Sequence, residues 1–352
     1  MPKRVGFLWE KMVAEENCIA AESIMGRNKP KNRMAKHIAE NPETYGKALR
    51  EKLISGEYRF SEPYKVTITD SYKGKTRNLM IPNLENQAAM QAWLNIATPY
   101  IVRRNYYYNC GSIPCAGQSR AVNGLKRKLK SKKPPKWAAM TDIRKFYETC
   151  PHEAVLRGLR RIFKDEKFID FAKRMMDSMS DNGIGLAIGY PVSHWFANIA
   201  LCELDMSLRR RYPDVLHFRY MDDVPLVSRN KRHLRRALAY YMDGVKHLGM
   251  EVKANWQVFP IKARGITFLS YRFFHGFTLL TKPLMYRIAR RIKSAAKSMG
   301  AHEAASVMSY LGILRHCDSH NFFVKHIYPY INPIKCRRII SNASKDVLRC
   351  AA

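Results

Sequence analysis

Acidic residues are scarce in this chain. Its 352 residues include 29 Asp and Glu against 62 Lys and Arg, so the formal net charge is +33. Folding does not need this excess, and the excess costs self-repulsion, so it indicates a polyanionic partner, most often nucleic acid. A ribosome-like protein or a membrane-surface protein is the alternative that the charge leaves open.

Long apolar runs are also missing. A helix needs about 18 consecutive apolar residues to cross a bilayer, and the sequence holds no such run. The N-terminus leads from Met1-Pro2-Lys3-Arg4 into a mixed polar segment without an apolar signal region. We therefore expect a cytoplasmic protein that has no membrane partner.

Paired cysteines are the third absence. The eight cysteines are scattered, and Cys110 and Cys115, the closest pair, have no second pair at zinc-ligand spacing. Unpaired thiols are the better interpretation. Aromatic residues, in contrast, are plentiful, with 19 Tyr, 15 Phe and 5 Trp in a chain of 46% hydrophobic content. They predict a real core, divided over two or three subdomains, and argue against a disordered basic tail.

The periodicity predicts a mixture of helices and short strands. Residues 1–56 read mostly as helix, 64–70 and 77–81 as paired strands, and 137–142 as an apolar strand. Further helices are expected at 85–98, 153–163, 168–179, 193–210 and 231–248, with extended segments at 251–260 and 265–274. Residues 126–136 carry seven Lys and Arg around Pro134-Pro135 and are expected to form an exposed loop, either solvated or in contact with phosphate.

Two adjacent carboxylates stand at the tip of an expected hairpin. Tyr220-Met221-Asp222-Asp223 follows one short extended run and precedes another. Burial of both strands would force the acidic pair into a tight turn, where it can hold a divalent cation against phosphate oxygens. Like charges this close repel, so a bound metal would relieve the site.

A second carboxylate and an aromatic residue fit the same chemistry. Asp142 ends the apolar strand, and pairing of that strand with the hairpin would bring it to the acidic pair, as two-metal phosphoryl transfer requires. A helix N-cap is the alternative role of Asp142. Tyr147 could lie under the sugar of a nucleotide and exclude a 2′-hydroxyl, and a core aromatic is its alternative. Lys253 is either a general acid for pyrophosphate or a solvated lysine.

The order and spacing of these motifs resemble a reverse transcriptase. The resemblance covers about residues 60–330 and rests on Thr141 to Tyr147, Ile188 to Asn198, Tyr220 to Asp223, and Phe268 to Tyr271. It implies an α+β, right-hand polymerase fold with fingers, a palm with an antiparallel sheet, and a helical thumb. The narrower resemblance is to the bacterial group-II-intron-like lineage, especially to enzymes of diversity-generating retroelements and phage-borne relatives.

The resemblance implies roles for named residues. Those that would bind two Mg²⁺ ions, with Mn²⁺ as a substitute, are Asp142, Asp222, Asp223 and the Ile143 carbonyl. Those that would contact the nucleotide are Lys75, Arg77, Tyr147, Ile188 and Gly189, and the primer grip would be Phe268, Leu269, Ser270 and Tyr271. Ile188 stands where many relatives have Gln, so low fidelity is a hypothesis. His194 replaces a Gln and Ser270 a Gly of the retroelement pattern.

Basic residues at helical spacing predict a thumb helix that follows a duplex by its phosphates. Ile288 and Ile292 would face inward. The residues expected to contact the nucleic-acid backbone are Lys126, Arg127, Lys128, Arg287, Arg290, Arg291 and Lys297.

These observations predict an RNA-directed DNA polymerase of bacterial or phage origin. Its partners would be template RNA, a primer/cDNA duplex and deoxynucleoside triphosphates, and a small accessory protein or a structured noncoding RNA stays open. The expected division is an N-terminal helical basic extension (1–60), fingers (61–136), palm with part of the fingers (137–275), and thumb with C-terminal tail (276–352). The rivals are a phage-defence enzyme of the same chemistry and a noncatalytic, maturase-like RNA-binding protein.

Overall fold

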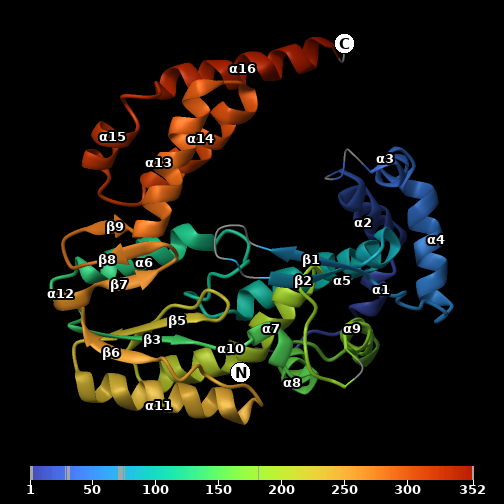
Figure 1. Ribbon diagram of the computed structural model, residues 1–352. Coiled ribbons are helices and arrows are strands. Elements are labelled where there is room, and N and C mark those ends of the chain that lie inside the picture. The colour runs from blue at the N-terminus through green and yellow to red at the C-terminus, as the bar shows by residue number, and fades with distance from the viewer. Residues whose placement is uncertain are drawn as a thin grey trace.

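In the part of the chain that the structure describes, helices alternate with three antiparallel sheets (Figure 1). The protein's structure, a computed structural model, describes residues 3–27, 29, 32–69, 74, 76–180 and 182–350, and for residues 344–350 it describes the backbone alone. The helices are α1 (Trp9–Met12), α2 (Glu15–Arg27), α3 (Arg33–Glu40), α4 (Pro42–Ile54), α5 (Leu84–Arg104), α6 (Gly117–Leu129), α7 (Phe146–Thr149), α8 (His152–Ile162), α9 (Glu166–Asp177), α10 (Ser193–Arg211), α11 (Lys231–His247), α12 (Ile261–Arg264), α13 (Lys282–Lys297), α14 (Ala301–Leu314), α15 (His320–His326) and α16 (Pro333–Cys350). The strands are β1 (Tyr64–Thr69), β2 (Thr76–Ile81), β3 (Trp137–Asp142), β4 (Leu216–His217), β5 (Asp223–Ser228), β6 (Gln257–Pro260), β7 (Ile266–Phe268), β8 (Tyr271–Phe273) and β9 (Thr278–Leu280).

The central sheet has the strand order β4-β5-β3-β6 and is antiparallel throughout. Its middle strand β3 buries Ala138 and Ala139 completely, because neighbouring elements cover the strand. Helix α11 packs against β3 and β5 and lies beneath the sheet in the view of Figure 1. Its buried side chains recur at helical spacing, at Leu234, Ala237, Leu238, Tyr241 and Val245. One amphipathic helix thus closes one face of the sheet.

The N-terminal helices pack around α2, which contacts α3, α4 and α5. Helices α2 and α4 approach closely at Gly46, where an added Cβ would lie 2.8 Å from the Ile19 backbone. Helix α5 continues past Pro99 and places Trp93 in the core, stacked on Phe168 with ring centroids 5.1 Å apart. Between α4 and α5, the hairpin β1–β2 exposes most of its residues on both faces. This hairpin projects from the helical core toward the centre of the molecule (Figure 1).

The C-terminal part consists of a small sheet followed by helices. Strands β7, β8 and β9 pair antiparallel in sequence order. Helices α13 to α16 then extend away from the central sheet and from the sheet β7–β9 toward the C-terminus, as the orange and red ribbons of Figure 1 show. Tyr271 of β8 connects the small sheet to the helices that follow it, because its hydroxyl donates to the Ile313 carbonyl of α14 at 2.9 Å.

Most of the expected elements are confirmed, with two corrections. Residues 126–129 are not part of an exposed loop, because they form the last turn of α6 and Leu129 is buried. The apolar positions Ala121, Val122 and Leu125 of α6 give this helix a buried face despite its basic end. The strand pair expected at 265–274 is confirmed as β7 and β8, but a third strand, β9, lies beyond it where only helix was expected.

Two of the expected absences can be compared with the structure. Within the described residues, no helix combines the length and apolar character that crossing a membrane requires. The seven cysteines whose side chains are described are all free thiols.

Candidate active site

The acidic pair lies in a tight two-residue turn at the end of the central sheet. Tyr220 and Asp223 form a bridge in which the Tyr220 N–H donates to the Asp223 carbonyl at 3.0 Å and the Asp223 N–H donates back at 3.2 Å. Met221, the first residue between them, has φ of +58°. Turns of this length need a positive φ, which is usually supplied by glycine. The turn therefore has the geometry expected from the sequence, with strain at a non-glycine residue.

The register of the central sheet brings Asp142 to this turn. Asp142 of β3 pairs with Asp223 of β5, and the next N–H, that of Ile143, donates to the Asp222 carbonyl at 3.3 Å. The Thr141 hydroxyl fixes the same edge by donating to the Val224 carbonyl at 3.2 Å. Asp142 and the acidic pair, which begins 80 residues later at Asp222, therefore stand at one end of one sheet.

Lys253 makes an ion pair with Asp142. Its Nζ lies 2.6 Å from Asp142 Oδ1, and its backbone N–H donates to the Asp142 carbonyl at 2.8 Å. Lys253 is therefore not the freely solvated lysine that was one of its two expected roles. Its ammonium neutralises the Asp142 carboxylate, at the end of the sheet where Asp222 and Asp223 also stand.

The donor chemistry of this site suits a hard divalent cation. Carboxylate oxygens, with a backbone carbonyl such as that of Ile143, are the ligands that Mg²⁺ prefers. Within the described ranges, however, no three His, Cys, Asp or Glu side chains are close enough together to hold a metal ion. The Lys253 ammonium lies where a cation bound to Asp142 would be placed. The donor types thus fit Mg²⁺, and the predicted ligand set stays a prediction.

Tyr147 stands against the acidic turn. Its hydroxyl donates to Met221 Sδ at 3.4 Å, and its carbonyl accepts from the Leu186 N–H at 2.7 Å. Burial, and secondly the Asp222 carboxylate, raise the pKa of Tyr147 to about 12. The phenol is therefore neutral at pH 7 and presents a half-buried ring beside Asp222. This placement is compatible with both roles expected for Tyr147.

Ile188 and Gly189 connect the loop of residues 182–192, called the palm loop below because it precedes α10 in the region expected to be the palm, to the hairpin β1–β2. The Met80 N–H of β2 donates to the Ile188 carbonyl at 2.8 Å. Gly189 has φ of +117°, and a Cβ on it would lie 2.4 Å from the Met80 carbonyl oxygen. The Ser193 hydroxyl, which donates to the Ala187 carbonyl at 2.6 Å, holds the loop from the other side. Glycine is required at 189 because the backbone of β2 occupies the space of a side chain.

The two residues expected on the hairpin have different outcomes. Arg77 is exposed on β2 and pairs in register with Ile68. Arg77 lies three residues before Met80 on β2. The hydrogen bond from Met80 to Ile188 therefore fixes the strand that carries Arg77. Lys75 lies outside the described residues.

The expected primer grip forms the turn between β7 and β8. Phe268 pairs with Tyr271, and both rings are buried, whereas Leu269 and Ser270 form the turn with φ of +52° and +68°. Two consecutive positive φ values are the pattern of a hairpin that usually contains glycine. Ser270 is exposed, and its carbonyl accepts from the Thr281 N–H at 3.0 Å, which ties the turn to the start of α13.

The basic residues are less uniformly exposed than their spacing predicts. Lys126 donates to the His316 carbonyl at 3.4 Å and is partly buried, whereas Arg127 and Lys128 are exposed. On α13, Ile288 and Ile292 are fully buried as expected. Arg287 and Arg291 are only half exposed, and Arg291 Nε donates to Ser306 Oγ of α14 at 3.2 Å. The four basic residues expected to contact nucleic acid from α13 thus differ in exposure, and their contact with phosphates stays a prediction.

The exposed face of α13 includes residues that the sequence analysis missed. Arg290 and Lys297 share it with Lys293 and with Tyr286, whose side chain is 72% exposed. Positions 286, 290, 293 and 297 are separated by three or four residues, so they lie on one helical face. The sequence offered one sign of this face, because Tyr286 stands at helical spacing from Arg290 and Lys297.

A buried polar cluster behind the acidic turn was also missed. It joins Arg219 with Asp205 and Asn198 of α10, and all three are fully or almost fully buried. Arg219 was readable as a signal, because it is a charged residue in an otherwise apolar strand that leads to the acidic pair. His194, at the start of α10, is neutral at pH 7, since burial lowers its pKa to about 4.

One family model matches the region that contains this site. Residues 73–273 match the family described as reverse transcriptase (RNA-dependent DNA polymerase). The matched stretch includes the three aspartates, Tyr147, the palm loop and the turn between β7 and β8. Among curated proteins, none matches the sequence.

Solved structures similar to the chain include three of telomerase from Candida tropicalis. The apo enzyme shows 14% identity and a TM-score of 0.45 over 62% of this chain and 48% of its own. Apo telomerase truncated from its C-terminal domain gives 12% and 0.44 over 66% and 57%, respectively. Telomerase in complex with a TWJ fragment of telomeric RNA gives 13% and 0.47 over 77% and 56%. The chain spans about half the length of the telomerase chains it matches.

Proposed function

This chain belongs to the reverse transcriptase family, and from that premise we propose that it is an RNA-directed DNA polymerase that makes cDNA by two-metal nucleotidyl transfer. Its α+β architecture is that of the right-hand polymerases. The observation that carries the proposal is the pairing of Asp142 with Asp223 across β3 and β5, with Asp222 in the adjoining turn. A protein that only binds RNA has no use for clustered acids at one sheet edge.

In the proposed reaction, the 3′-hydroxyl of a primer attacks the α-phosphate of a deoxynucleoside triphosphate and pyrophosphate leaves. Asp142, Asp222 and Asp223 would hold two Mg²⁺ ions, or Mn²⁺ in their place, whose charge would lower the pKa of the hydroxyl and neutralise the phosphates. The neutral ring of Tyr147 lies beside Asp222 and limits the space for a 2′-hydroxyl. With a cation bound at Asp142, the Lys253 ammonium would be released, and we assign it as the proton donor to the leaving pyrophosphate.

The nucleic-acid partners are assigned from charge and position. Template RNA and the primer/cDNA duplex would be held through phosphates by the exposed face of α13, by Arg127 and by Lys128. Deoxynucleoside triphosphates would meet Arg77 of β2, and Lys75, Ile188 and Gly189 are proposed as further contacts. Since these contacts are ionic, affinity for an RNA–DNA hybrid should fall steeply between low and high salt, and a flat salt dependence would argue against this interface.

Primer extension tests the proposed chemistry. Purified protein, Mg²⁺, a primed RNA template and labelled deoxynucleotides should give cDNA, and the Asp222→Asn/Asp223→Asn variant should give none. Asp243→Asn, on the exposed face of α11, is the matched control and should extend normally. If native protein and the double variant give the same amount of cDNA, the polymerase proposal fails and the maturase-like RNA-binding alternative is favoured.

The finer assignment is to the bacterial group-II-intron-like lineage, with an error-prone enzyme of a diversity-generating retroelement as the leading candidate and a phage-defence enzyme as its rival. Support comes from Ile188, an aliphatic residue whose backbone is fixed by Met80 and whose half-exposed side chain offers no polar contact. Sequencing of cDNA from native protein and from Ile188→Gln tests the fidelity hypothesis. Equal error rates at template adenines would remove Ile188 as the cause.

A further inference from the structure

The Tyr220–Asp223 turn adopts a conformation that its own sequence does not favour. Met221 has a positive φ, although glycine or asparagine is the usual residue at such a position. A conformation of this kind persists only where the surroundings impose it. The elements behind the turn should therefore contain the groups that hold it.

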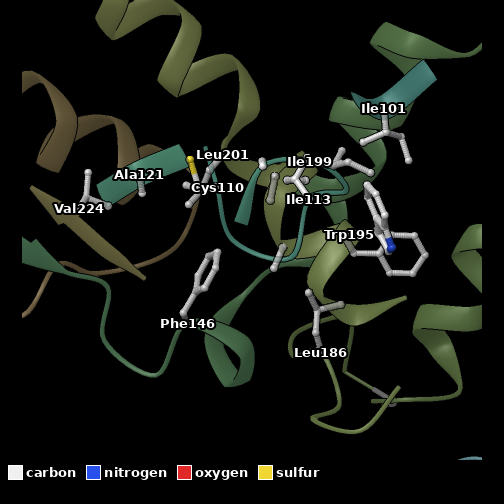
Figure 2. Close-up of a cluster of buried hydrophobic side chains, with 14 of the residues drawn as sticks. Ile101, Cys110, Ile113, Ala121, Phe146, Leu186, Trp195, Ile199, Leu201 and Val224 are labelled. Atoms are coloured by element: carbon white, nitrogen blue, oxygen red, sulfur yellow. The ribbon is translucent and has the colours of Figure 1, made fainter. Parts of the chain in front are cut away.

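The backbone of Arg219 is fixed on both sides by the segment before α6. Its N–H donates to the Tyr108 carbonyl at 2.9 Å, and its carbonyl accepts from the Cys110 N–H at 2.8 Å. Residues 108–110 thus act as a short parallel neighbour of the strand that leads into the turn. Cys110 belongs to the same buried cluster as Leu201 of α10 and Val224 of β5, as Figure 2 shows.

The Arg219 side chain is buried in a charged and fully enclosed setting. Its Nε and Nη2 lie 2.8 and 2.7 Å from Asp205 Oδ2, and its Nη1 donates to Asn198 Oδ1 at 2.8 Å. Burial would raise the pKa of Asp205, but the Arg219 guanidinium and His217 together hold that pKa below its usual range. Buried ion pairs add little net stability, because desolvation offsets their attraction. Their use is to fix one arrangement.

A chain of contacts returns from Asn198 to the turn itself. Asn198 Nδ2 donates to the Gly111 carbonyl at 2.8 Å. Gly111 in turn approaches Met221 so closely that an added Cβ would lie 2.7 Å from the Met221 backbone nitrogen. The contacts therefore form a closed circuit from Arg219, through Asn198 and Gly111, to Met221, two residues after Arg219.

We propose that Gly111, Asn198 and the Asp205–Arg219 ion pair are positioning residues that set the distance of the Tyr220–Asp223 turn from Asp142. All four residues are buried, so each would act through the turn and not by contact with substrate. Gly111 supports Met221 from behind, and Arg219 fixes the strand that enters the turn. The proposal rests on the proposed polymerase function, because it concerns the spacing of the carboxylates that would bind the cations.

Gly111→Ala tests the circuit with one methyl group. Gly111 has no positive φ, so alanine fits the backbone and the change acts through the contact with Met221. We expect kcat to fall about 10- to 100-fold, with the Kd for a primed template unchanged, because small displacements of reacting groups have effects of this size. The Mg²⁺ concentration for half-maximal rate should rise, and Mn²⁺ binding followed by electron paramagnetic resonance should weaken in parallel.

Gly46→Ala is the matched control for general destabilisation. A Cβ at Gly46 of α4 would lie 2.7 Å from Ile19 Cγ1 and 2.8 Å from the Ile19 backbone nitrogen, a clash of similar severity that touches none of the positioning residues. This variant should lower the melting temperature without changing Mn²⁺ affinity or the Mg²⁺ dependence. Equal changes in both variants at equal loss of melting temperature would overturn the proposal.

Two further results complete the test. If Gly111→Ala does not fold, Asn198→Ala carries the same expectation, and an unchanged kcat and Mn²⁺ affinity in that variant would refute the positioning role. The Mn²⁺ titration does not need turnover. Suppose that the native protein does not extend primers but that Gly111→Ala still weakens Mn²⁺ binding. The proposed polymerase function would then be refuted, and the positioning role of Gly111 would be supported.

Discussion

Replacement of Gly189 by alanine should separate the hairpin β1–β2 from the palm loop. The alanine Cβ would lie 2.4 Å from the Met80 carbonyl oxygen, a distance that requires the backbone of β2 to move. Alanine at φ of +117° costs about 1–3 kcal/mol. Loss of the Met80–Ile188 hydrogen bond removes about 0.5–1.5 kcal/mol more. The contact should therefore weaken by about 2–4 kcal/mol.

Steady-state incorporation of a single deoxynucleotide measures the consequence. If 2–3 kcal/mol of this loss falls on the nucleotide-bound state, kcat/KM should drop by roughly 30- to 150-fold. Most of the drop should be in KM, because Arg77 lies on the strand that moves while the three aspartates do not. Urea unfolding of the same samples reports how much of the loss reaches global stability.

Gly183→Ala is the control within the same loop. Gly183 also has a positive φ, +70°, but a Cβ there would meet no atom within 4 Å. This variant shares the backbone cost and lacks the collision with β2. If both variants lower kcat/KM by the same factor, the approach of Gly189 to Met80 is not what holds the hairpin, and the reasoning is refuted.

Three further predictions follow from single residues. Burial, and then the Glu85 carboxylate, raise the pKa of Glu22 to about 7 from 4.5, so the unfolded state loses its proton first and stability falls as pH rises between these values. Glu22→Gln should therefore gain on the order of 2–3 kcal/mol in urea unfolding at pH 8 and nothing at pH 4, and an equal gain at both would contradict the assignment. Tyr147→Ala should raise the ribonucleotide to deoxynucleotide ratio of kcat/KM at least about tenfold, whereas Tyr147→Phe keeps the ring and should not; equal behaviour of the two would exclude the ring as the gate. Ser270→Gly should relieve a positive φ and stabilise the protein by about 0.5–1 kcal/mol in thermal unfolding, and a lower melting temperature would show that the turn is not strained there.

Local patterns were sufficient for the parts of the site that depend on neighbours in sequence. The apolar run before Asp142 predicted β3, and the acidic pair between two extended runs predicted the turn after Tyr220. Both follow from short-range burial and turn geometry, which a linear pattern records. The spacing of Ile288 and Ile292 likewise predicted the buried face of α13.

Local patterns failed where tertiary contacts decide the environment of a charged residue. Lys126 looked like a solvent-exposed loop residue, but α6 carries it to the end of α14. For Arg291 the phosphate contact stays a prediction, and the helical spacing gave no sign of the hydrogen bond that its Nε donates to Ser306 of the next helix. A basic residue can lie in water or against a neighbouring carbonyl, and helical spacing within one helix does not distinguish the two.

The sequence by itself determined the chemistry of this protein: three carboxylates suited to divalent cations, one aromatic residue beside them, and a basic surface for a polyanion. It did so because residue type fixes ligand preference and charge. Only the tertiary structure decided how these groups meet. The register of β3 with β5 sets Asp142 opposite Asp223, and the contacts of Arg219 and Gly111 hold a turn that Met221 would not adopt alone. Those distances arise between segments up to about a hundred residues apart, so no local pattern encodes them.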